Sequence, residues 1–455
     1  MKIALVSPRL ETNIYHQPVV GLAYLKSYLR EKGIKDVSIF DAFKSSDKAI
    51  RDFFIKENPD IIGISCLTLY RNNAFRMAEI AKNCLPGVTI IMGGIHATLM
   101  AEEIMKRYSF VDYIVMGEGE LTFYELVESI NKKNPAREVC GIAGREGEKI
   151  FKTQKRAAIQ DLDILPFPEY IELNHEDMFG VKAALAISSR GCGHACNYCS
   201  TTRYWGRWRG RSPKNVVDEM EFLEKEKGVR YIVYEDDSFT MDFERTEAIC
   251  NERLKRKLQI PWRCNTRADR ITKYLCDMMA KAGCVHIGYG IETGSPTILK
   301  NINKQMTTEQ IKNAFKWTKE SGMATKAFFM VGNIGETRKT INETKELIEE
   351  IKPDKFVVSQ YVYIFPFTPL YEHAKKHGLI DDSFWLGERT VMPYTLENSI
   401  EQMSGWQMEI IKTCFRHKPK WEYYKYAFEM AKTLPKKDIV RAGINFLKSQ
   451  IKQAR

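Results

Sequence analysis

Three closely spaced cysteines, Cys192, Cys196 and Cys199, carry the clearest chemistry in this sequence of 455 residues. Their spacing, C-x3-C-x2-C, places three thiolates on one tight loop, where they can hold three irons of a [4Fe–4S] cube. Gly191 and Gly193 let such a loop curl closely around an anionic cluster. A structural cluster normally takes four cysteines, and no fourth cysteine lies in the same run. One iron is therefore expected to be open to a non-protein ligand, which indicates chemistry at that iron.

Two alternatives for these thiols are a zinc site and a set of buried, unreactive cysteines. Zinc sites usually pair C-x2-C with a second ligand pair downstream, and none follows here, although His194 lies inside the loop. The spacing, with the aromatic Tyr198 just before the third cysteine, resembles the radical S-adenosylmethionine (radical SAM) superfamily. The resemblance implies that Tyr198 borders the SAM site and that the open iron chelates the amino and carboxylate groups of SAM. It also implies that the reduced cluster breaks a C–S bond to give a 5′-deoxyadenosyl radical.

The composition is that of a globular protein, with 44% apolar and 28% charged residues. The chain is too long for one ordinary core, so two or three domains are expected. Eleven cysteines is an odd number, and those outside the triplet are scattered singly, which favours a reducing compartment over a disulfide framework. We expect these other thiols to be small buried hydrophobes.

The N-terminal run Met1–Pro8 is too short for a signal peptide, and no stretch reaches the ~18 apolar residues of a membrane helix. These features predict a cytoplasmic protein, and an oxygen-labile cluster predicts an anaerobic cell. The net charge is +11, and residues 411–455 hold twelve Lys or Arg against Glu422, Glu429 and Asp438. This basic segment could bind an anionic substrate, or an anionic membrane surface on which each cation adds ~1 kcal/mol. A solvated helical face is the plainer alternative.

Residues 1–135 alternate short apolar runs with stretches of helical periodicity, the pattern of a Rossmann-like, doubly wound parallel sheet in an α/β fold. The strands are expected at Lys2–Ser7, Val37–Phe40, Ile61–Cys66, Val88–Met92 and Tyr113–Met116. The helices are expected near residues 19–33, 46–58, 71–84 and 98–107, and after Glu120. Ligands of such sheets bind at the carboxyl ends of the strands.

A second alternation begins at Ala184, after a predicted linker at 136–183 that contains the proline-rich run Asp161–Pro168. Its strands are expected at Ala184–Ser188, Tyr231–Glu235, Trp262–Thr266, Val285–Gly290, Ala327–Val331 and Phe356–Ile364. Its helices are expected near residues 213–227, 242–256, 271–282, 308–321, 337–351 and 369–377. Six such units over 184–378 predict a partial (β/α)6 barrel, whose active residues collect at the carboxyl ends of the strands. Residues 379–455 lack strand patterning and predict a small, basic, helical C-terminal domain.

Three consecutive carboxylates, Glu235, Asp236 and Asp237, end the second barrel strand. Packing three acids together costs repulsion, so a positive group is expected beside them. The sulfonium and ammonium of SAM would supply it, and in the radical SAM family an Asp-Asp pair at this strand end is common near the active site. A solvated turn, or a helix N-cap by Asp237, is the alternative without a ligand.

Further candidates for SAM binding end the third and fourth barrel strands. Arg267 could pair with the SAM carboxylate through its fork of N–H donors, with a surface salt bridge as the alternative. Gly290 permits close approach of a ligand, and Glu292 could accept hydrogen bonds from ribose hydroxyls. The family resemblance supports this pair, because a Gly-x-Glu-like run at this place lines the SAM pocket in its members.

Four arginines are interleaved with aromatic residues at 203–211, between the cluster loop and the first barrel helix. Such a strip can bind nucleic acid, but this one is short and adjoins the cluster. We favour a lid that excludes water from radical chemistry, and an anionic substrate could use its charge.

Taken whole, residues 1–375 resemble the radical SAM proteins that carry an N-terminal B12-binding (cobalamin-binding) domain. The run Pro59–Ser65, the Gly93-Gly94 turn and the run Gly117–Glu120 fit that subgroup. In the subgroup, the cobalt of cobalamin faces SAM and substrate across the domain junction, and methylcobalamin donates a methyl group to a substrate carbon radical. The cobalamin contacts that the resemblance implies are Ser65, Leu67, Thr68, Gly93, Gly94, His96, Gly117, Glu118 and Gly119.

One signature of the subgroup is absent, namely Asp-x-His-x-x-Gly, whose histidine can replace the lower cobalt ligand. His16 lies in the matching loop, but Ile14 and Gly21 do not complete the signature. Members without that histidine bind cobalamin with the lower face free or held otherwise, and others keep the domain without a cofactor. Bound cobalamin is the favoured prediction.

Together these features predict a radical SAM enzyme that modifies an unactivated carbon, with C-methylation as the leading reaction. C–C coupling, cyclisation or rearrangement without methyl transfer is the alternative, and a non-catalytic iron–sulfur sensor or electron carrier is the alternative of a different class. The expected cofactors are a [4Fe–4S] cluster, SAM and cobalamin. The expected partners are a small-molecule or lipid-like substrate and a low-potential electron donor such as ferredoxin or flavodoxin, and nucleic acid is not expected.

Overall fold

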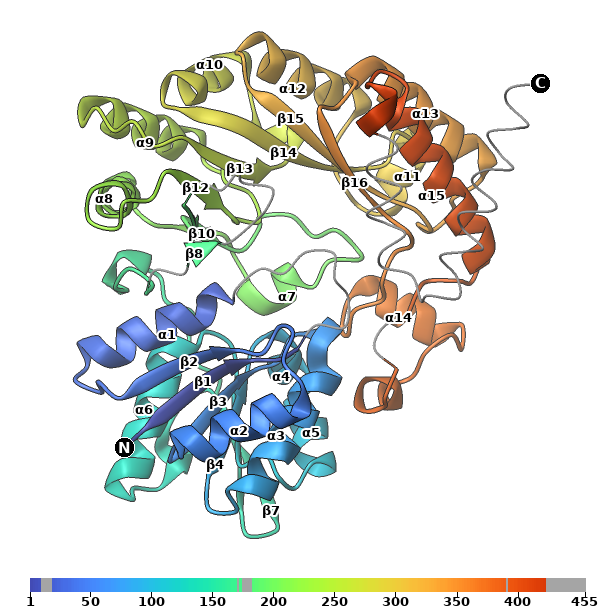
Figure 1. Ribbon diagram of the computed structural model, residues 1–455. Coiled ribbons are helices and arrows are strands. Elements are labelled where there is room, and N and C mark those ends of the chain that lie inside the picture. The colour runs from blue at the N-terminus through green and yellow to red at the C-terminus, as the bar shows by residue number, and fades with distance from the viewer. Residues whose placement is uncertain (10–18, 170–171, 174–181, 390–391, 423–455) are drawn as a thin grey trace.

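Two seven-stranded sheets organise the chain, one below the other in Figure 1. The computed structural model describes residues 1–9, 19–169, 172–173, 182–389 and 392–422. The loop with His16 and residues 423–455 of the predicted basic domain therefore lie outside the described residues. The lower sheet belongs to the N-terminal part of the chain and the upper sheet to its middle.

The first sheet has the strand order β2-β1-β3-β4-β5-β6-β7. Its strands are β1 (Ile3–Ser7), β2 (Val37–Asp41), β3 (Ile61–Ser65), β4 (Thr89–Gly93), β5 (Tyr113–Val115), β6 (Ile142–Glu146) and β7 (Lys149–Lys152). Strands β1 to β5 are parallel. The five predicted strands of residues 1–135 are thus all present.

Helices cover both faces of this sheet, because successive side chains of a strand point to opposite sides. Ile3 and Leu5 pack with α1 and α6, whereas Ala4 and Val6 belong to the core on the side of α2 to α5 (Figure 1). The helices are α1 (Val20–Glu31), α2 (Asp47–Glu57), η1 (Thr68–Tyr70), α3 (Arg71–Cys84), α4 (Ile95–Leu99), α5 (Ala101–Arg107), α6 (Gly119–Lys132) and η2 (Ala136–Glu138). The predicted doubly wound, Rossmann-like architecture is confirmed.

The stretch 136–183, which the sequence predicts to be a linker, is not free of regular structure. Strands β6 and β7 form a hairpin that pairs antiparallel with β5 and extends the first sheet. The turn of this hairpin uses Gly147 with φ +59°. The hairpin lies at the edge of the sheet. Its buried residues are few, namely Ile142 to Gly144 and Phe151, so it lacks the longer apolar run that marks the other buried strands, and the sequence pattern misses it.

The second sheet has the order β16-β15-β14-β13-β12-β9-β8. Its strands are β8 (Glu172–Leu173), β9 (Ala183–Ala186), β12 (Tyr231–Tyr234), β13 (Trp262–Thr266), β14 (Cys284–Glu292), β15 (Ala324–Met330) and β16 (Lys355–Ser359), and a separate pair is β10 (Ser189–Arg190) with β11 (Arg209–Gly210). Strands β9 to β16 of this sheet are parallel, and β8 runs antiparallel to β9. This is the predicted partial (β/α)6 barrel.

Helices follow the strands of the barrel, and several begin at a side chain that accepts a backbone N–H bond. Thr307 and Gln310 form a capping box at α12, and Ser212 caps α8, whose first residue is Pro213. The helices are η3 (Leu162–Ile164), α7 (Thr201–Trp205), α8 (Pro213–Lys225), α9 (Phe243–Lys255), η5 (Ala268–Arg270), α10 (Lys273–Lys281), α11 (Pro296–Asn301), α12 (Thr308–Glu320), α13 (Arg338–Ile351), α14 (Pro369–Lys376), η6 (Asp382–Leu386) and α15 (Ile400–Phe415).

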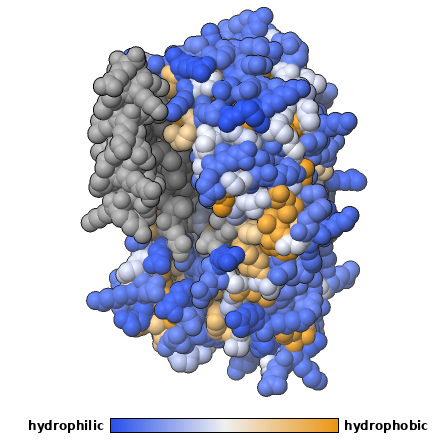
Figure 2. All heavy atoms as spheres, turned by 90° about the vertical axis from the view of Figure 1, so that its right-hand side faces the viewer, coloured by the Kyte–Doolittle hydropathy of each residue, from blue (hydrophilic) through white to orange (hydrophobic). Residues whose placement is uncertain are grey.

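The C-terminal helices pack on both preceding parts of the chain. Met403 and Trp406 of α15 are buried in the same core as the barrel, whereas Trp385 of η6 is buried in the core of the first domain. The predicted boundary at 379 therefore does not coincide with a change of hydrophobic core. The side of the molecule that carries α14 and α15 is largely hydrophilic, with a smaller apolar area near its middle (Figure 2). No helix among the described residues is long and apolar enough to cross a membrane.

Candidate active site

The cluster loop lies between β10 and α7 and carries Cys192, Cys196 and Cys199, each partly exposed and free of a disulfide. Gly191 adopts φ +83°, and a Cβ atom there would lie 3.0 Å from the carbonyl oxygen of Arg207, so this position requires glycine. Burial raises the pKa of the Cys192 and Cys199 thiols. The first strand of the barrel thus leads directly into three accessible thiols, as the sequence predicts.

Backbone hydrogen bonds within this loop, and between the loop and distant segments, fix its conformation. The N–H of Cys199 donates to the carbonyl of Cys196 at 3.2 Å, and the N–H of Asn197 donates to the carbonyl of Ile302 at 3.1 Å. The N–H of Leu370 in turn donates to the carbonyl of Asn197 at 3.0 Å. Within the described ranges, no three His, Cys, Asp or Glu side chains converge closely enough to hold a single metal ion. A set of three thiols with no fourth cysteine in the loop fits a cluster, whose thiolates ligate different irons.

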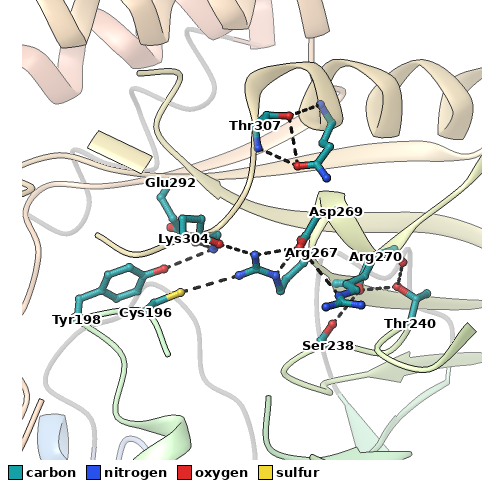
Figure 3. Close-up of polar contacts among 12 residues, drawn as sticks. Cys196, Tyr198, Ser238, Thr240, Arg267, Asp269, Arg270, Glu292, Lys304 and Thr307 are labelled. Atoms are coloured by element: carbon teal, nitrogen blue, oxygen red, sulfur yellow. Dashed lines mark hydrogen bonds and ion pairs between the residues drawn. The ribbon is translucent and has the colours of Figure 1, made fainter. Parts of the chain in front are cut away.

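Arg267, at the end of β13, lies against the cluster loop (Figure 3). Its guanidinium is buried, with Nη1 3.9 Å from the sulfur of Cys196 and Nε 2.8 Å from the carboxylate of Asp269. Arg267 is therefore placed at the cluster loop, but it contacts Cys196 and Asp269 rather than standing free.

Lys304 is a site residue that the sequence reasoning missed. Its ammonium is buried, lies 2.7 Å from the carboxylate of Glu292 and 3.4 Å from the hydroxyl of Tyr198, and so joins two predicted SAM residues (Figure 3). Its carbonyl accepts a hydrogen bond from Arg267. The loop Asn303–Gln305 carries no strand, helix or motif signal, although its neighbours on both sides adopt positive φ, so only the fold reveals it.

Tyr198 and Glu292 lie together at the carboxyl end of β14. Burial, and then the charge of Glu292, raise the pKa of Tyr198 well above its ordinary value, so the hydroxyl stays neutral. Glu292 adopts φ +66°, next to a register shift between Gly290 and Glu292 that turns its side chain inward toward Lys304. A Cβ atom on Gly290 would lie 3.0 Å from the Glu292 carboxylate, so glycine here leaves room for that carboxylate.

The three acids at the end of β12 have separate surroundings. Asp236 is buried and accepts hydrogen bonds from the N–H and hydroxyl of Ser188, at 3.1 and 2.9 Å, and from the hydroxyl of Ser189. Glu235 accepts hydrogen bonds from Arg263 at 3.3 Å and from Asn265 on β13. Asp236 therefore braces the strand that enters the cluster loop, and Glu235 faces the neighbouring strand.

Asp237 is the acid that faces the cluster loop. The hydroxyl of Thr201, two residues after Cys199, donates to its carboxylate at 3.4 Å. Desolvation by the surrounding protein, and then the charge of Asp236, raise the pKa of Asp237 to about 6, although part of the residue is exposed to solvent. Of the three acids, Asp237 is the one that a cation bound next to the cluster loop could contact.

The run 203–211, which the sequence predicts to be a lid, has two exposed arginines, Arg203 and Arg207. Arg209 and Arg211 of that run are buried, and each forms an ion pair, Arg209 with Glu118 at 2.8 Å and Arg211 with Glu219. These two ion pairs join the run to the first domain and to α8. Two of the four arginines thus belong to a buried interface, and the role of the run as a lid stays a prediction.

The carboxyl ends of three neighbouring strands of the first sheet carry most of the predicted cobalamin residues. Ser65 ends β3, Gly93 ends β4, and Gly117 follows β5. No atom lies within 4 Å of the place where a Cβ of Gly117 would be, and around Gly93 the nearest is 3.8 Å away. Leu67 and Thr68 follow β3 at η1. This edge offers open backbone of the kind that a large, flat ligand needs, so the residues present fit cobalamin.

Four predicted cobalamin contacts have close protein neighbours instead. Gly94 has φ +99°, and its Cβ would lie 3.0 Å from the carbonyl of Cys66; a Cβ on Gly119 would lie 3.1 Å from Leu25. His96 is fully buried between the rings of Phe75 and Trp385, and burial lowers its pKa to about 3. Glu118 forms ion pairs with Arg190 and Arg209.

A pH effect on stability arises at Glu336, which follows β15. It is buried and accepts hydrogen bonds from the N–H groups of Gly332 and Asn333. Burial raises its pKa from 4.5 to about 7, and Glu397 contributes to the rise. The folded state therefore holds this proton more tightly than the unfolded state, so the stability present below about pH 4.5 is lost as the pH rises through about 7.

We predict that Glu336→Gln abolishes the loss of folding stability that the wild type shows as the pH rises through about 7. The variant stays neutral, so its free energy of unfolding should exceed that of the wild type by an amount that grows with pH, up to ~3 kcal/mol. Thermal unfolding of both proteins at about pH 5 and pH 8 measures this. An equal difference in Tm at both pH values would contradict it.

Comparison with known proteins agrees with the two-part architecture. The radical SAM superfamily matches residues 186–348, and the B12 binding domain matches residues 13–127. An uncharacterised methyltransferase of Pyrococcus horikoshii is 33% identical over 409 residues, which are 86% of this chain and 87% of the relative. An anaerobic magnesium-protoporphyrin IX monomethyl ester cyclase of Rubrivivax gelatinosus is 32% identical over 370 residues, 78% of this chain and 66% of the cyclase.

A solved structure shares the whole arrangement. The cobalamin-dependent S-adenosylmethionine radical enzyme OxsB, with aqua-cobalamin bound, matches with a TM-score of 0.72 at 19% identity, over 99% of this chain and 71% of that one. At this identity the likeness shows the fold. Together with the family matches and the relative at 33% identity, it places both predicted domains in one known architecture. The chain belongs to the radical SAM superfamily of enzymes, among the members that carry an N-terminal B12-binding domain.

Proposed function

We propose that the protein uses a [4Fe–4S] cluster, SAM and cobalamin to methylate an unactivated carbon of a small-molecule substrate. The observation that carries this proposal is the position of α7, which directly follows the three-cysteine loop and contacts the carboxyl edge of the first sheet. The hydroxyl of Tyr204 donates to the carbonyl of Gly117 at 2.9 Å across this junction. This contact supports a cluster and a cobalamin bound close to each other.

The cluster would be held by Cys192, Cys196 and Cys199, and when bound it supplies an open iron for SAM and the electron that cleaves a SAM C–S bond. Around it, Glu292 would accept hydrogen bonds from ribose hydroxyls while Lys304 holds its carboxylate in place. Asp237 would attract the positive groups of SAM. Arg267, Asp236 and Glu235 would support the loop and strands rather than touch SAM, because protein partners already occupy their polar atoms.

The cobalamin would lie along the edge that Gly93 and Gly117 leave open, next to Leu67 and to the buried Ser65 and Thr68, and when bound it supplies a carrier for the methyl group. The small-residue backbone there permits close approach of the flat ring. We assign Gly94 and Gly119 to the tight local packing that forms this edge. His96 is assigned to the core, since its ring lies among Phe75 and Trp385.

Methyl transfer is preferred over cyclisation because this chain matches 87% of the length of the methyltransferase relative, but only 66% of the length of the cyclase. Cyclisation stays the second candidate, because that cyclase is nearly as similar in sequence. We also propose that a low-potential donor of the ferredoxin or flavodoxin class reduces the cluster. Peripheral contact with an anionic membrane would need the basic segment 411–455, and vesicle co-sedimentation with and without residues 423–455 tests it.

The products of SAM distinguish the two reactions. After anaerobic loading with iron, sulfide and cobalamin, methyl transfer should consume SAM in two ways and yield both S-adenosylhomocysteine and 5′-deoxyadenosine. Mass spectrometry of reactions with a reductant, and with a panel of small aromatic and tetrapyrrole substrates, measures both products. Only 5′-deoxyadenosine, with cobalamin unbound, would overturn methylation in favour of cyclisation.

A further inference from the structure

A buried ionic network joins the cluster loop to the first domain. Arg190 Nη1 lies 2.7 Å from Glu118 Oε1, and Arg190 Nη2 lies 2.5 Å from Glu120 Oε1. The second oxygen of Glu118 accepts a hydrogen bond from Arg209 Nη1 at 2.8 Å. We call these four residues the Arg190 clamp. None of their side chains is more than 8% exposed, so the network is shielded from water.

The clamp connects the two places where cofactors are expected. Arg190 lies two residues before Cys192, the first cysteine of the cluster loop. Glu118 and Glu120 lie one and three residues after Gly117, where the backbone is open. A movement of Glu118 or Glu120 would therefore move Arg190 and the start of the cluster loop, and also the proposed cobalamin edge at Gly117.

Aromatic rings and backbone groups complete the enclosure. The guanidinium of Arg190 lies 5.4 Å from the ring of Tyr24 on α1 and 5.3 Å from the ring of Trp205 on α7, one ring from each domain. The N–H of Ile159 donates to Glu118 Oε2 at 2.7 Å. Burial alone would lower the pKa of Arg190, but Glu120 and Glu118 raise it above its ordinary value, so the cation stays charged.

A buried ion pair adds less stability than apolar packing of the same volume, because desolvation offsets most of its attraction. What it supplies is geometry, since a planar fork satisfies two carboxylates in only one arrangement. This network is built from both domains at their junction. We propose that the Arg190 clamp fixes the cluster loop relative to the first domain, so that radical formation and methyl transfer take place at a constant separation.

This inference rests on the proposed function for its purpose, but its geometry can be tested separately. The test variant is Glu120→Gln, which keeps the shape of the side chain and removes one charge that faces Arg190. A second variant, Arg190→Lys, keeps the cation but loses the fork that reaches both carboxylates. The matched control is Glu219→Gln, because Glu219 pairs with Arg211 at similar burial entirely within the barrel.

The first readout uses the protein loaded with cluster and cobalamin. Pulsed EPR measures the magnetic coupling between the reduced cluster and cob(II)alamin. We expect a defined coupling in the wild type and in Glu219→Gln, and a weaker, broader one in Glu120→Gln and Arg190→Lys, with unchanged iron content. Equal couplings in all four proteins would overturn the inference.

The second readout needs no cobalamin. In the cluster-loaded protein, limited proteolysis within residues 153–183 should be faster by about tenfold in Glu120→Gln than in Glu219→Gln, because the clamp then holds two buried cations against one carboxylate, which favours separation of the domains. If wild-type protein fails to bind cobalamin, the proposed function fails, yet this rate still decides the clamp. Equal cleavage rates in both variants would refute it.

Discussion

Cys196→Ala should prevent assembly of the cluster and abolish reductive cleavage of SAM. The loop offers three thiols, and two thiolates cannot hold three irons of the cube while leaving one iron open. The loss should be complete because the run contains no fourth cysteine that could replace the missing thiol. After anaerobic reconstitution, the variant should bind iron at background level, lack the visible absorption of the cluster, and form no 5′-deoxyadenosine above a blank without enzyme.

The control for this prediction is Cys250→Ala, which removes a fully buried thiol on α9. Burial raises the pKa of Cys250 to about 12, so this residue is a thiol and packs as a small hydrophobe. The control should load iron normally and lose only about 1 kcal/mol of stability. A cluster of wild-type content in Cys196→Ala would remove the basis of the proposed function.

The cluster loop could be predicted from the sequence because all of its chemistry lies within the nine residues 191–199. Cysteine spacing, the two glycines and the aromatic before the third cysteine are local features, and the structure places them as expected. The alternation of the buried strands is equally local, since it depends on continuous apolar runs. The fold class and the position of the three-cysteine loop were thus within reach of pattern alone.

The surroundings of the loop could not be predicted in the same way, because they are built from residues far apart in the chain. Lys304 reaches Tyr198 across 106 positions, and Arg190 reaches Glu118 across 72. The sequence marks Glu118 and Arg267 as polar residues at strand ends, which is true, but it cannot show which polar atoms other protein groups already occupy. Predictions of cofactor contacts from strand ends therefore contain residues that brace the site as well as residues that face it.

The edge hairpin and the arginine-rich run are two segments whose burial the sequence pattern does not show. Strands β6 and β7 combine a few buried residues with charged, exposed ones, so their pattern resembles a linker. Arg209 and Arg211 are charged yet buried, since the partners that neutralise them, Glu118 and Glu219, lie elsewhere in the sequence. Burial in both cases is a tertiary property, and charge along the chain is a poor guide to it.

Lys304→Met should destabilise the protein and also weaken SAM binding. The Lys304 and Glu292 side chains are 6% and 10% exposed, so the variant leaves a buried carboxylate without its partner, at a cost of about 3–5 kcal/mol. Thermal unfolding should show a fall in Tm of roughly 6–20 °C. Affinity for SAM in the cluster-loaded protein should fall roughly 10–100-fold, because Glu292 loses the orientation in which it accepts ribose hydroxyls.

The double variant Lys304→Met/Glu292→Gln separates these two effects. It removes the unpaired charge, so most of the lost Tm should return, whereas SAM affinity should stay low because a neutral amide accepts the ribose hydrogen bonds less strongly. Lys312→Met provides the control, since the pair of Lys312 with Glu350 is exposed and its loss should cost at most about 1 kcal/mol and leave SAM binding unchanged. Equilibrium dialysis with labelled SAM measures the affinities. Wild-type SAM affinity in the double variant would limit Lys304 and Glu292 to a role in folding, and the SAM site would then have to be sought at Asp237 alone.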